Sequence, residues 1–378
     1  MPSTLATLIV GGGPAGLAAA WAAVQSGDQV TLLDDNPALG GQIWRGEIPK
    51  AYHRFLDPRI TVRTGVQIHS ANHLPAADRI ILATGTRERF LPFPGWTLPH
   101  VLGAGGLQAM VKSGLPIAGK RVVITGSGPL LLAVGAYLRK RGAKVVLIAE
   151  QAPFARIAQF TRELWREPGK LFQAAQLGWG LRYRADAWPI RADAGSITIQ
   201  GHGKIPCDYV GCGFGLVSNT ELPALLGCAI DAGQVVTDSK QRTTIPHIYW
   251  AGAGSVDRSI LEGQIAGFDL ERARPLYPAR DRALRFDRRI DQAFRLRSEL
   301  SNLATPDTIV CRCEDVPFGA VWQQRDWRSA KLQTRCGMGP CQGRICGPAL
   351  EHLCGWPASS VRPPIFPTRL ENLLDERR

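Results

Sequence analysis

The sequence predicts an α/β protein with two Rossmann-like domains and a small cysteine-rich C-terminal domain. Two glycine-rich turns, beginning at Gly11 and Gly126, each follow a short apolar run and precede a stretch rich in Ala or Leu. This order of strand, turn and helix is typical of parallel α/β units. Six of the nine cysteines then lie between Cys311 and Cys354, which marks a separate unit at the end of the chain.

Length and composition limit the classes of protein. The 378 residues suffice for two or three domains with their own cores. No apolar run reaches the ~20 residues of a membrane span, and residues 1–8 lack the parts of a signal peptide, so a cytoplasmic protein is expected. Lys and Arg outnumber Asp and Glu by 45 to 32, but they are spread along the chain without a nucleic-acid motif. The excess favours an acidic protein partner or an anionic substrate, with a merely basic surface as the alternative.

The first glycine-rich turn is expected to bind a dinucleotide. Leu8–Val10 fits a buried strand, Leu17–Gln25 fits a helix, and a G-x-G-x-x-G pattern connects them. Its first glycine permits the tight turn, its second lets the backbone approach a pyrophosphate, and its third lets the helix pack on the strand. The free N–H groups of the helix then face the phosphates. The residues assigned to this turn are Gly11, Gly13, Pro14, Ala15 and Gly16.

An acid follows where a dinucleotide site needs one. Gly27 ends the predicted helix, Val30–Leu33 forms the second strand, and Asp34 comes directly after it. A carboxylate at this position can accept hydrogen bonds from ribose hydroxyls. Strand, turn, helix, glycine stop and acid together favour a dinucleotide site over an ordinary glycine-rich turn.

Three later segments are expected to complete this site. One is a flexible loop after the second strand, and the other two are the ends of buried strands at Ile80–Ala83 and Ile248–Ala251. Small residues there let the backbone pass close to a ligand. A helix is expected to begin in a capping box of the form S-x-x-E at Ser259 and to run to about Arg272. The assigned contacts are Gly41, Gln42, Thr84, Gly85 and Gly252.

The second glycine-rich unit repeats the first but looks degenerate. Leu131 stands where the third glycine is needed for close packing of helix on strand. Glu150 lies eight residues past the glycine that stops the helix, whereas Asp34 lies seven past its own, and Ala149 takes the matching position. A slip of one residue on a strand turns the side chain to the other face. The unit is therefore expected to be an empty scaffold or to hold another nucleotide such as ATP, with a working NAD(P) site as the alternative.

The C-terminal cysteines predict a metal centre. C-x-C at Cys311 and Cys313 is followed by RCGMGPCQGRIC, and four thiolates can hold the two irons of a [2Fe–2S] cluster. Two pairs fit the spacing, Cys336 with Cys341 or Cys341 with Cys346, and structural zinc is the alternative metal. The glycines of this segment, Gly337, Gly339 and Gly343, let its N–H groups fold toward cluster sulfurs. The remaining cysteines are expected to be small buried hydrophobes: Cys207, Cys212, Cys228 and Cys354.

These motifs divide the chain into four expected regions. Residues 1–105 and 238–273 are expected to form a discontinuous dinucleotide-binding domain, and 106–237 an inserted NAD(P)-like domain. Residues 274–305 form an Arg-rich helical linker with apolar positions near helical spacing. Residues 306–378 form the [2Fe–2S] domain, whose tail from Pro357 to Pro367 holds four prolines. That tail is expected to be extended and to wrap over a neighbour.

Taken together, the motifs resemble the flavoprotein subunits of heteromeric amino-acid and imino-acid dehydrogenases. That family includes the A subunit of opine oxidase, the B subunit of hydrogen cyanide synthase and the alpha subunit of D-hydroxyproline dehydrogenase. The shared segments are VGGGPAG, GGQ, ILATGTRER, FPGW, EGQIAG and CRCED with TRCGMGPCQGRIC. The C-terminal part is similar to bacterioferritin-associated ferredoxin.

The resemblance implies bound FAD, a [2Fe–2S] cluster and a separate FAD-dependent subunit that oxidises the substrate. A small third ferredoxin-like subunit is a further candidate partner. The implied cluster ligands are Cys311, Cys313, Cys341 and Cys346. The chain departs from the family at Ala253, where an acid usually reaches the flavin ribityl chain. Losing that hydrogen bond weakens flavin binding by about 1–3 kcal/mol.

The favoured function is therefore that of an electron-transfer subunit in a heteromeric dehydrogenase for an amino acid, an imino acid or an opine. No group of His, Tyr or Arg residues stands out as a catalytic site, so the catalytic residues stay unknown. A self-contained NAD(P)H-dependent flavin reductase and a catalytically silent nucleotide-binding scaffold are the alternatives. The absence of C-x-x-C from the sequence disfavours a disulfide reductase.

Overall fold

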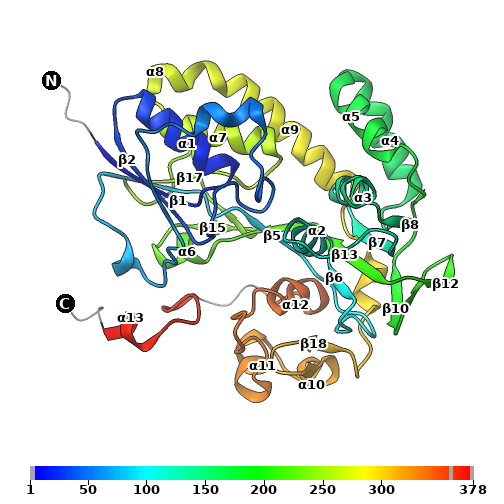
Figure 1. The fold of residues 1–378 in the computed structure, drawn as a ribbon. Coiled ribbons are helices and arrows are strands. Elements are labelled where there is room, and N and C mark those ends of the chain that lie inside the picture. Colours follow the sequence, from blue (N-terminus) through cyan, green and yellow to red (C-terminus); the bar gives the residue numbers. More distant parts are fainter. Residues whose placement is uncertain (1–4, 357–360, 375–378) are drawn as a thin grey trace. The chain divides into compact units, whose positions relative to one another are not determined.

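The computed structural model describes residues 5–356 and 361–374, and the chain divides into two compact units (Figure 1). Among the described residues, the first unit contains 5–87, 217–287 and 361–374, and the second contains 88–216 and 288–356. Each unit holds one five-stranded parallel sheet. The predicted α/β class with two Rossmann-like halves is confirmed.

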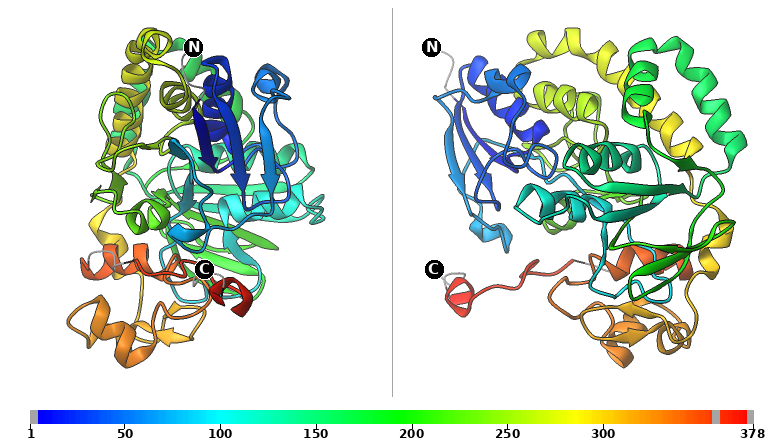
Figure 2. Two further views of the ribbon diagram at one scale, coloured as in Figure 1. Left: turned by 90° about the vertical axis from the view of Figure 1, so that its left-hand side faces the viewer. Right: turned by 45° about the vertical axis from the view of Figure 1, so that its right-hand side comes forward.

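The sheet of the first unit has the strand order β17–β4–β1–β2–β3. Apolar side chains fill the inner strands because a parallel sheet is covered on both faces. Three of its strands, β1, β2 and β3, run side by side in the left view of Figure 2. The bounds are β1 (Ala6–Val10), β2 (Gln29–Asp34), β3 (Thr61–Thr64), β4 (Arg79–Leu82) and β17 (Ile248–Trp250).

Two helices, α1 (Pro14–Gln25) and α7 (Val256–Gly267), pack together in this unit (Figure 1). Glycine permits the close approach: a Cβ on Gly263 would lie 2.1 Å from the carbonyl oxygen of Ala15. The first helix begins at Pro14, three residues earlier than predicted, because proline suits the first helical position.

The predicted start of the second helix is wrong. Helix α7 begins at Val256, and the Ser259 N–H already donates to the carbonyl of Ser255 at 2.8 Å. Ser259 is thus an interior residue of the helix and caps nothing. The helix ends at Gly267, and a separate short helix, α8 (Leu270–Ala273), follows.

The sheet of the second unit has the strand order β6–β13–β7–β8–β9, beside an antiparallel sheet β10–β11–β12. The bounds are β6 (Val101–Gly103), β7 (Arg121–Ser127), β8 (Lys144–Glu150), β9 (Tyr183–Arg184), β10 (Pro189–Asp193), β11 (Ser196–Ile199), β12 (Gly203–Pro206) and β13 (Tyr209–Phe214). Its helices are α2 (Ala104–Lys112), α3 (Leu130–Lys140), α4 (Phe154–Glu163) and α5 (Pro168–Gly178). Cys207 and Cys212 are buried in its core and Cys228 in that of the first unit, as predicted for small hydrophobes.

The cysteine-rich segment belongs to the second unit. The indole N–H of Trp96 donates to the carbonyl of Ile309 at 2.5 Å and joins the segment to the core around Phe90. Its elements are β18 (Ile309–Cys311), β19 (Val316–Pro317), α10 (Phe318–Trp322), α11 (Trp327–Thr334) and α12 (Cys346–Cys354). The Arg-rich linker forms α9 (Tyr277–Ala293).

The tail packs on its own chain, in the first unit. Ile365 is buried beside Leu8 and Trp250, and its N–H donates to the carbonyl of His69 at 2.9 Å. Pro357 lies outside the described residues. The short elements not yet named are β5 (Thr86–Glu88), β14 (Leu216–Ser218), β15 (Ile230–Asp231), β16 (Gln234–Val235), α6 (Glu221–Leu225), α13 (Leu370–Leu374) and five 3-10 turns.

Across residues 5–356 and 361–374, none of the helices combines the length and the apolar character needed to cross a membrane.

Candidate functional site

The first glycine-rich turn has the geometry that its pattern predicts. Gly11 has φ +110°, and a Cβ there would lie 2.2 Å from the carbonyl oxygen of Ala83, which directly follows the neighbouring strand β4. A Cβ on Gly16 would lie 1.7 Å from the carbonyl oxygen of Gly11, so the helix rests directly on the turn. A Cβ on Gly13 would meet only Gly41, at 3.9 Å. The backbone at Gly13 is therefore open to a ligand.

Asp34 is buried at the end of β2 and fixed beside the turn. One carboxylate oxygen accepts a hydrogen bond from the N–H of Gly12, and the other accepts bonds from the backbone and side-chain N–H groups of Asn36 at 2.7 and 2.9 Å. These donors hold the carboxylate at the glycine turn. This is the location that binding of a ribose requires.

The loop after β2 lies on the same turn. The N–H of Gly40 donates to the carbonyl of Gly12 at 2.9 Å, and a Cβ on Gly41 would lie 3.0 Å from the Cα of Gly13. The side chain of Gln42 is exposed and accepts a hydrogen bond from Arg45 at 2.8 Å. The structure thus brings Gly41 to the turn, while the Gln42 amide is engaged with Arg45.

Thr84 and Gly85 follow β4, which pairs with β1 and β17. The hydroxyl of Thr84 donates to the carbonyl of Asn219 at 2.7 Å, and the Asn219 amide donates to the carbonyl of Thr84 at 2.8 Å. These two reciprocal hydrogen bonds fix the residues after β4, where Gly85 has φ +67°. Sequence reasoning missed Asn219, because no motif surrounds it.

Gly252 follows β17 and lies against the start of α1, where a Cβ would meet the Cβ of Ala15 at 2.8 Å. Its N–H donates to the buried carboxylate of Glu262 at 3.0 Å, and Glu262 also pairs with Arg258 at 2.6 Å. Sequence reasoning assigned Glu262 to a capping box and so missed this role. The usable signal was its place almost two turns into the helix that follows the Ala-Gly strand end.

The second glycine-rich turn corrects one sequence expectation. Strand β8 carries a register shift: Val122 pairs with Val145, but Val123 pairs with Leu147. The extra residue is a bulge, and it cancels the slip of one residue that separates Glu150 from the position of Asp34. Glu150 therefore pairs with Gly126 and points toward the turn. The prediction that it faces away is wrong.

Glu150 is held much as Asp34 is. Its carboxylate oxygens accept hydrogen bonds from the N–H groups of Gly128 at 2.7 Å and Ala152 at 2.8 Å. Leu131 is fully buried in the core beneath α3 and β7. The acid of a nucleotide site is thus in place, although the third glycine is not.

The chain itself covers one side of this second turn. The hydroxyl of Ser127, between the two turn glycines, donates to the carbonyl of Phe294 at 2.8 Å. The side chain of Gln151 donates to Ser127 at 2.8 Å and accepts from the N–H of Arg297 at 3.1 Å. The segment 294–297 therefore lies against the second glycine-rich turn.

Burial raises the pKa of Glu150 from 4.5 to about 7. Between these two pH values the folded chain holds a proton that the unfolded chain releases, so stability falls as the pH rises through this window. The loss amounts to on the order of 3 kcal/mol. We expect Glu150→Gln to remove this loss, measured as urea midpoints at pH 5 and pH 8. Glu299→Gln, at a half-exposed position, is the control and should keep the wild-type difference; an unchanged difference in Glu150→Gln would contradict the expectation.

Five cysteines converge in the C-terminal segment. The sulfur atoms of Cys311, Cys336 and Cys346 all lie within 4.8 Å of one another and are buried. The sulfur of Cys341 contacts those of Cys346 and Cys313. Cys313 is exposed and Cys341 is half-buried, so the group has a buried side and an open side.

Backbone and glycine geometry support a metal centre at this place. The N–H of Gly337 donates to the sulfur of Cys311 at 3.4 Å, which confirms that N–H groups of this loop turn toward the sulfurs. A Cβ on Gly339 would lie 2.3 Å from the Cβ of Cys313, so glycine brings the two cysteine segments together. Neighbouring thiols of Cys336 and Cys346 lower the pKa of Cys311 to about 2. The thiol of Cys346 lowers the pKa of Cys341 to about 5.

Comparison with known proteins shows the family of the chain. The model of the family described as pyridine nucleotide-disulphide oxidoreductase matches residues 5–266. The chain is 30% identical to the opine oxidase A subunit of Rhizobium meliloti, over 97% of this chain and 86% of the relative. It is 28% identical to hydrogen cyanide synthase subunit HcnB of Pseudomonas protegens, over 91% and 90%.

Two solved structures share the fold. L-proline dehydrogenase from P. horikoshii superposes with a TM-score of 0.65 at 18% identity, over 98% of this chain and 79% of that one. The thioredoxin reductase of T. acidophilum has a TM-score of 0.54 at 22% identity, over 73% and 98%. The first of these covers nearly the whole chain, and the second covers about three quarters of it.

Proposed function

Because the chain belongs to the pyridine nucleotide-disulphide oxidoreductase family and is related to the A subunit of opine oxidase, we propose that it is the electron-transfer subunit of a heteromeric dehydrogenase. The substrate is an amino acid, an imino acid or an opine, and it is oxidised on a partner flavin subunit. One observation carries the proposal: a complete dinucleotide turn and a convergent group of five cysteines occur in the same chain.

FAD fits the first turn. The N-terminus of α1 and the open backbone at Gly13 would take its pyrophosphate, and Asp34 would take its ribose. Gly41, Thr84–Gly85 and Gly252 would border the rest of the cofactor. When bound, FAD supplies the ability to accept two electrons and to pass them on one at a time.

Glu262 supports flavin binding despite Ala253. The carboxylate is fixed by Arg258 and accepts a hydrogen bond from the N–H of Gly252, so it orders the strand end where the family acid is missing. Arg258 also lies 3.6 Å from Asp287, which fixes its guanidinium from a second side. The expected loss in flavin affinity at Ala253 is therefore offset in part by a preorganised turn.

A [2Fe–2S] cluster fits the cysteine group. Cys311, Cys313, Cys341 and Cys346 would hold it, and Cys336 would pack behind Cys311 on the buried side. The exposed Cys313 and half-buried Cys341 put one edge of the group near solvent, where an electron could enter or leave. When bound, the cluster supplies one-electron transfer.

The charged groups around the first turn support the proposal that the substrate is oxidised on a partner subunit. The carboxylate of Asp34 accepts hydrogen bonds from Gly12 and Asn36. The carboxylate of Glu262 forms an ion pair with Arg258 and accepts a hydrogen bond from Gly252. Among the described residues that border this turn, these two carboxylates are thus committed to backbone and arginine partners. Neither is placed as a free base for an amine substrate.

An NAD(P)H-dependent flavin reductase is the second candidate, because Glu150 takes the place of a ribose-binding acid. Against it, the segment 294–297 covers Ser127 and Gln151 on one side of that turn. A silent scaffold with a nucleotide in the second unit explains Glu150 equally well, but it gives no reason for the five cysteines.

We expect the purified chain, loaded with FAD and iron, to turn over no amino or imino acid by itself, and NADH to leave its flavin absorbance unchanged under anaerobic conditions. Adding the substrate-oxidising partner together with its substrate should bleach that absorbance. Rapid bleaching by NADH alone would support the reductase instead. Steady turnover of an imino acid by the isolated chain would contradict the proposed division of labour.

A further inference from the structure

Two successive helices in the second unit expose aromatic side chains. They are α4 and α5, joined by the turn Leu164–Arg166 (Figure 1). We call the four most exposed aromatic residues of this segment the aromatic stripe: Phe154, Trp165, Phe172 and Trp179, with exposed fractions of 70%, 68%, 71% and 81%. Such a concentration of exposed aromatic surface marks a binding face.

These residues recur at helical intervals, with Phe154 in α4, Phe172 in α5, Trp165 in the turn between them and Trp179 directly after α5. Phe154 and Trp165 are connected by the exposed Ala158 and Thr161, at intervals of four, three and four residues. Phe172 and Trp179 have the exposed Ala175 between them, at intervals of three and four. Intervals of three and four residues keep side chains on one helix face. A stripe that is narrow and alternates with small residues suits a second helix packed along it.

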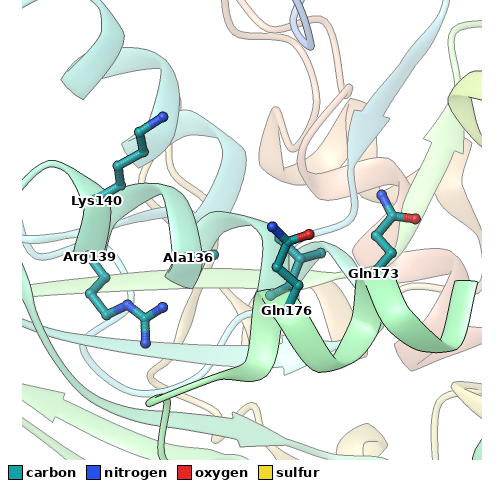
Figure 3. A pocket seen from close by; sticks show the side chains of 6 residues that line it. Ala136, Arg139, Lys140, Gln173 and Gln176 are labelled. Carbon is teal, nitrogen blue, oxygen red and sulfur yellow. The ribbon is translucent and has the colours of Figure 1, made fainter. Parts of the chain in front are cut away.

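A recess of about 550 Å³ adjoins the stripe, between α3 and α5. Arg139 and Lys140 line it from one helix, and Gln173 and Gln176 line it from the other (Figure 3). Arg139 donates to the carbonyl of Trp179, which connects the recess to the stripe. The described residues that line it include two cations and two amides but no carboxylate. This is the chemistry that receives an acidic side chain.

The net charge of the chain helps to decide which kind of partner binds this face. A second copy of the chain carries the same excess of cations, 45 Lys and Arg against 32 Asp and Glu, and would bring like charges together. A lipid surface could accept the aromatic residues, but a flat bilayer leaves the recess between α3 and α5 unfilled. An acidic protein helix fills both features.

We propose that the aromatic stripe and the Arg139–Lys140 recess dock an acidic helix of the substrate-oxidising partner subunit. The apolar face of that helix covers Phe172 and Trp179, and one of its carboxylates enters the recess. The proposal rests on the heteromeric role proposed above, and it adds the surface and the chemistry of the partner.

The test uses the full chain, loaded with FAD and iron, and the counterpart of the second opine oxidase subunit from the same source. We expect the double variant Phe172→Glu/Trp179→Glu to raise the Kd of the complex at least tenfold, because large aromatic residues dominate interface energetics. Lys140→Glu should raise it three- to tenfold, with a weaker salt dependence than the wild type. Flavin content, iron content and Tm should stay at wild-type values.

Trp322→Glu is the matched control, since Trp322 is 63% exposed but lies on α10, outside the stripe. It should bind as the wild type does. An unchanged Kd in the double variant overturns the docking surface and leaves the heteromeric role intact. A wild-type chain that binds no partner subunit overturns both. Binding of the wild type to phosphatidylserine vesicles, lost in the double variant while the complex persists, would assign the stripe to a membrane and overturn the proposal.

Discussion

Replacing Cys346 by Ser is expected to abolish the electron-paramagnetic signal of the reduced [2Fe–2S] cluster and to lower bound iron to a small fraction of two per chain. Cys346 is buried, begins α12 and lies within 4.8 Å of Cys311. Because metal binding is coupled to folding, a lost ligand removes part of the free energy that orders this segment. The segment should then unfold at lower temperature than the rest of the chain.

Cys336→Ser is the matched comparison, since Cys336 is equally buried and lies in the same group of sulfurs. A neighbour that is not a ligand costs only packing when it is replaced, on the order of 1 kcal/mol, so iron and signal should persist. The reverse result would move the fourth ligand to Cys336. Tightly bound zinc in the wild type would overturn the electron-transfer role altogether.

Gly16→Ala is expected to remove most of the flavin and to destabilise the first unit. The added Cβ would lie 1.7 Å from the carbonyl oxygen of Gly11 and 2.9 Å from its carbonyl carbon. Both are backbone atoms, so α1 must move away from β1 to relieve the overlap. Overpacking of this kind costs about 1–3 kcal/mol, and here the upper end applies because no flexible side chain can yield. A displaced helix N-terminus also loses its alignment with the pyrophosphate, so FAD should bind at least tenfold more weakly.

The ratio of flavin to protein absorbance after desalting, together with a thermal melt, measures both effects. Gly169→Ala is the control, because Gly169 lies in α5 and a Cβ there meets nothing within 4 Å. Alanine in a helix should keep or slightly raise the stability, by up to about 1 kcal/mol. Full flavin occupancy in Gly16→Ala would show that the turn does not hold the cofactor.

The sequence alone identified the elements that depend on interactions between residues close together in the chain. The G-x-G-x-x-G pattern, the glycine stop and Asp34 fix the first turn, because each residue acts on its own backbone or on the next strand. The family relationship and the α/β class also follow from motifs that can be counted along the chain. The cysteine motifs C-x-C and C-x4-C were also visible in the sequence, but the two motifs meet only through tertiary packing, where Gly339 lies against Cys313.

Tertiary structure decided the features that depend on how strands pair. Counting residues placed Glu150 on the wrong face, because one bulge in β8 between Val145 and Leu147 restores the register and cannot be read from spacing. In the same way, pairing across 167 residues brings Phe294 to Ser127 and covers one side of the second turn.

Side-chain partners far apart in the sequence were decided in the same way. Glu262 accepts a hydrogen bond from the N–H of Gly252 at the end of β17. It does not cap a helix, because α7 begins one turn earlier than the capping motif suggests. The proline-rich tail packs by Ile365 on the first unit of its own chain, where buried apolar side chains from distant segments form one surface. Spacing thus predicted which residues could bind, and long-range packing decided how each of them is placed, because burial and strand register depend on contacts that no local pattern encodes.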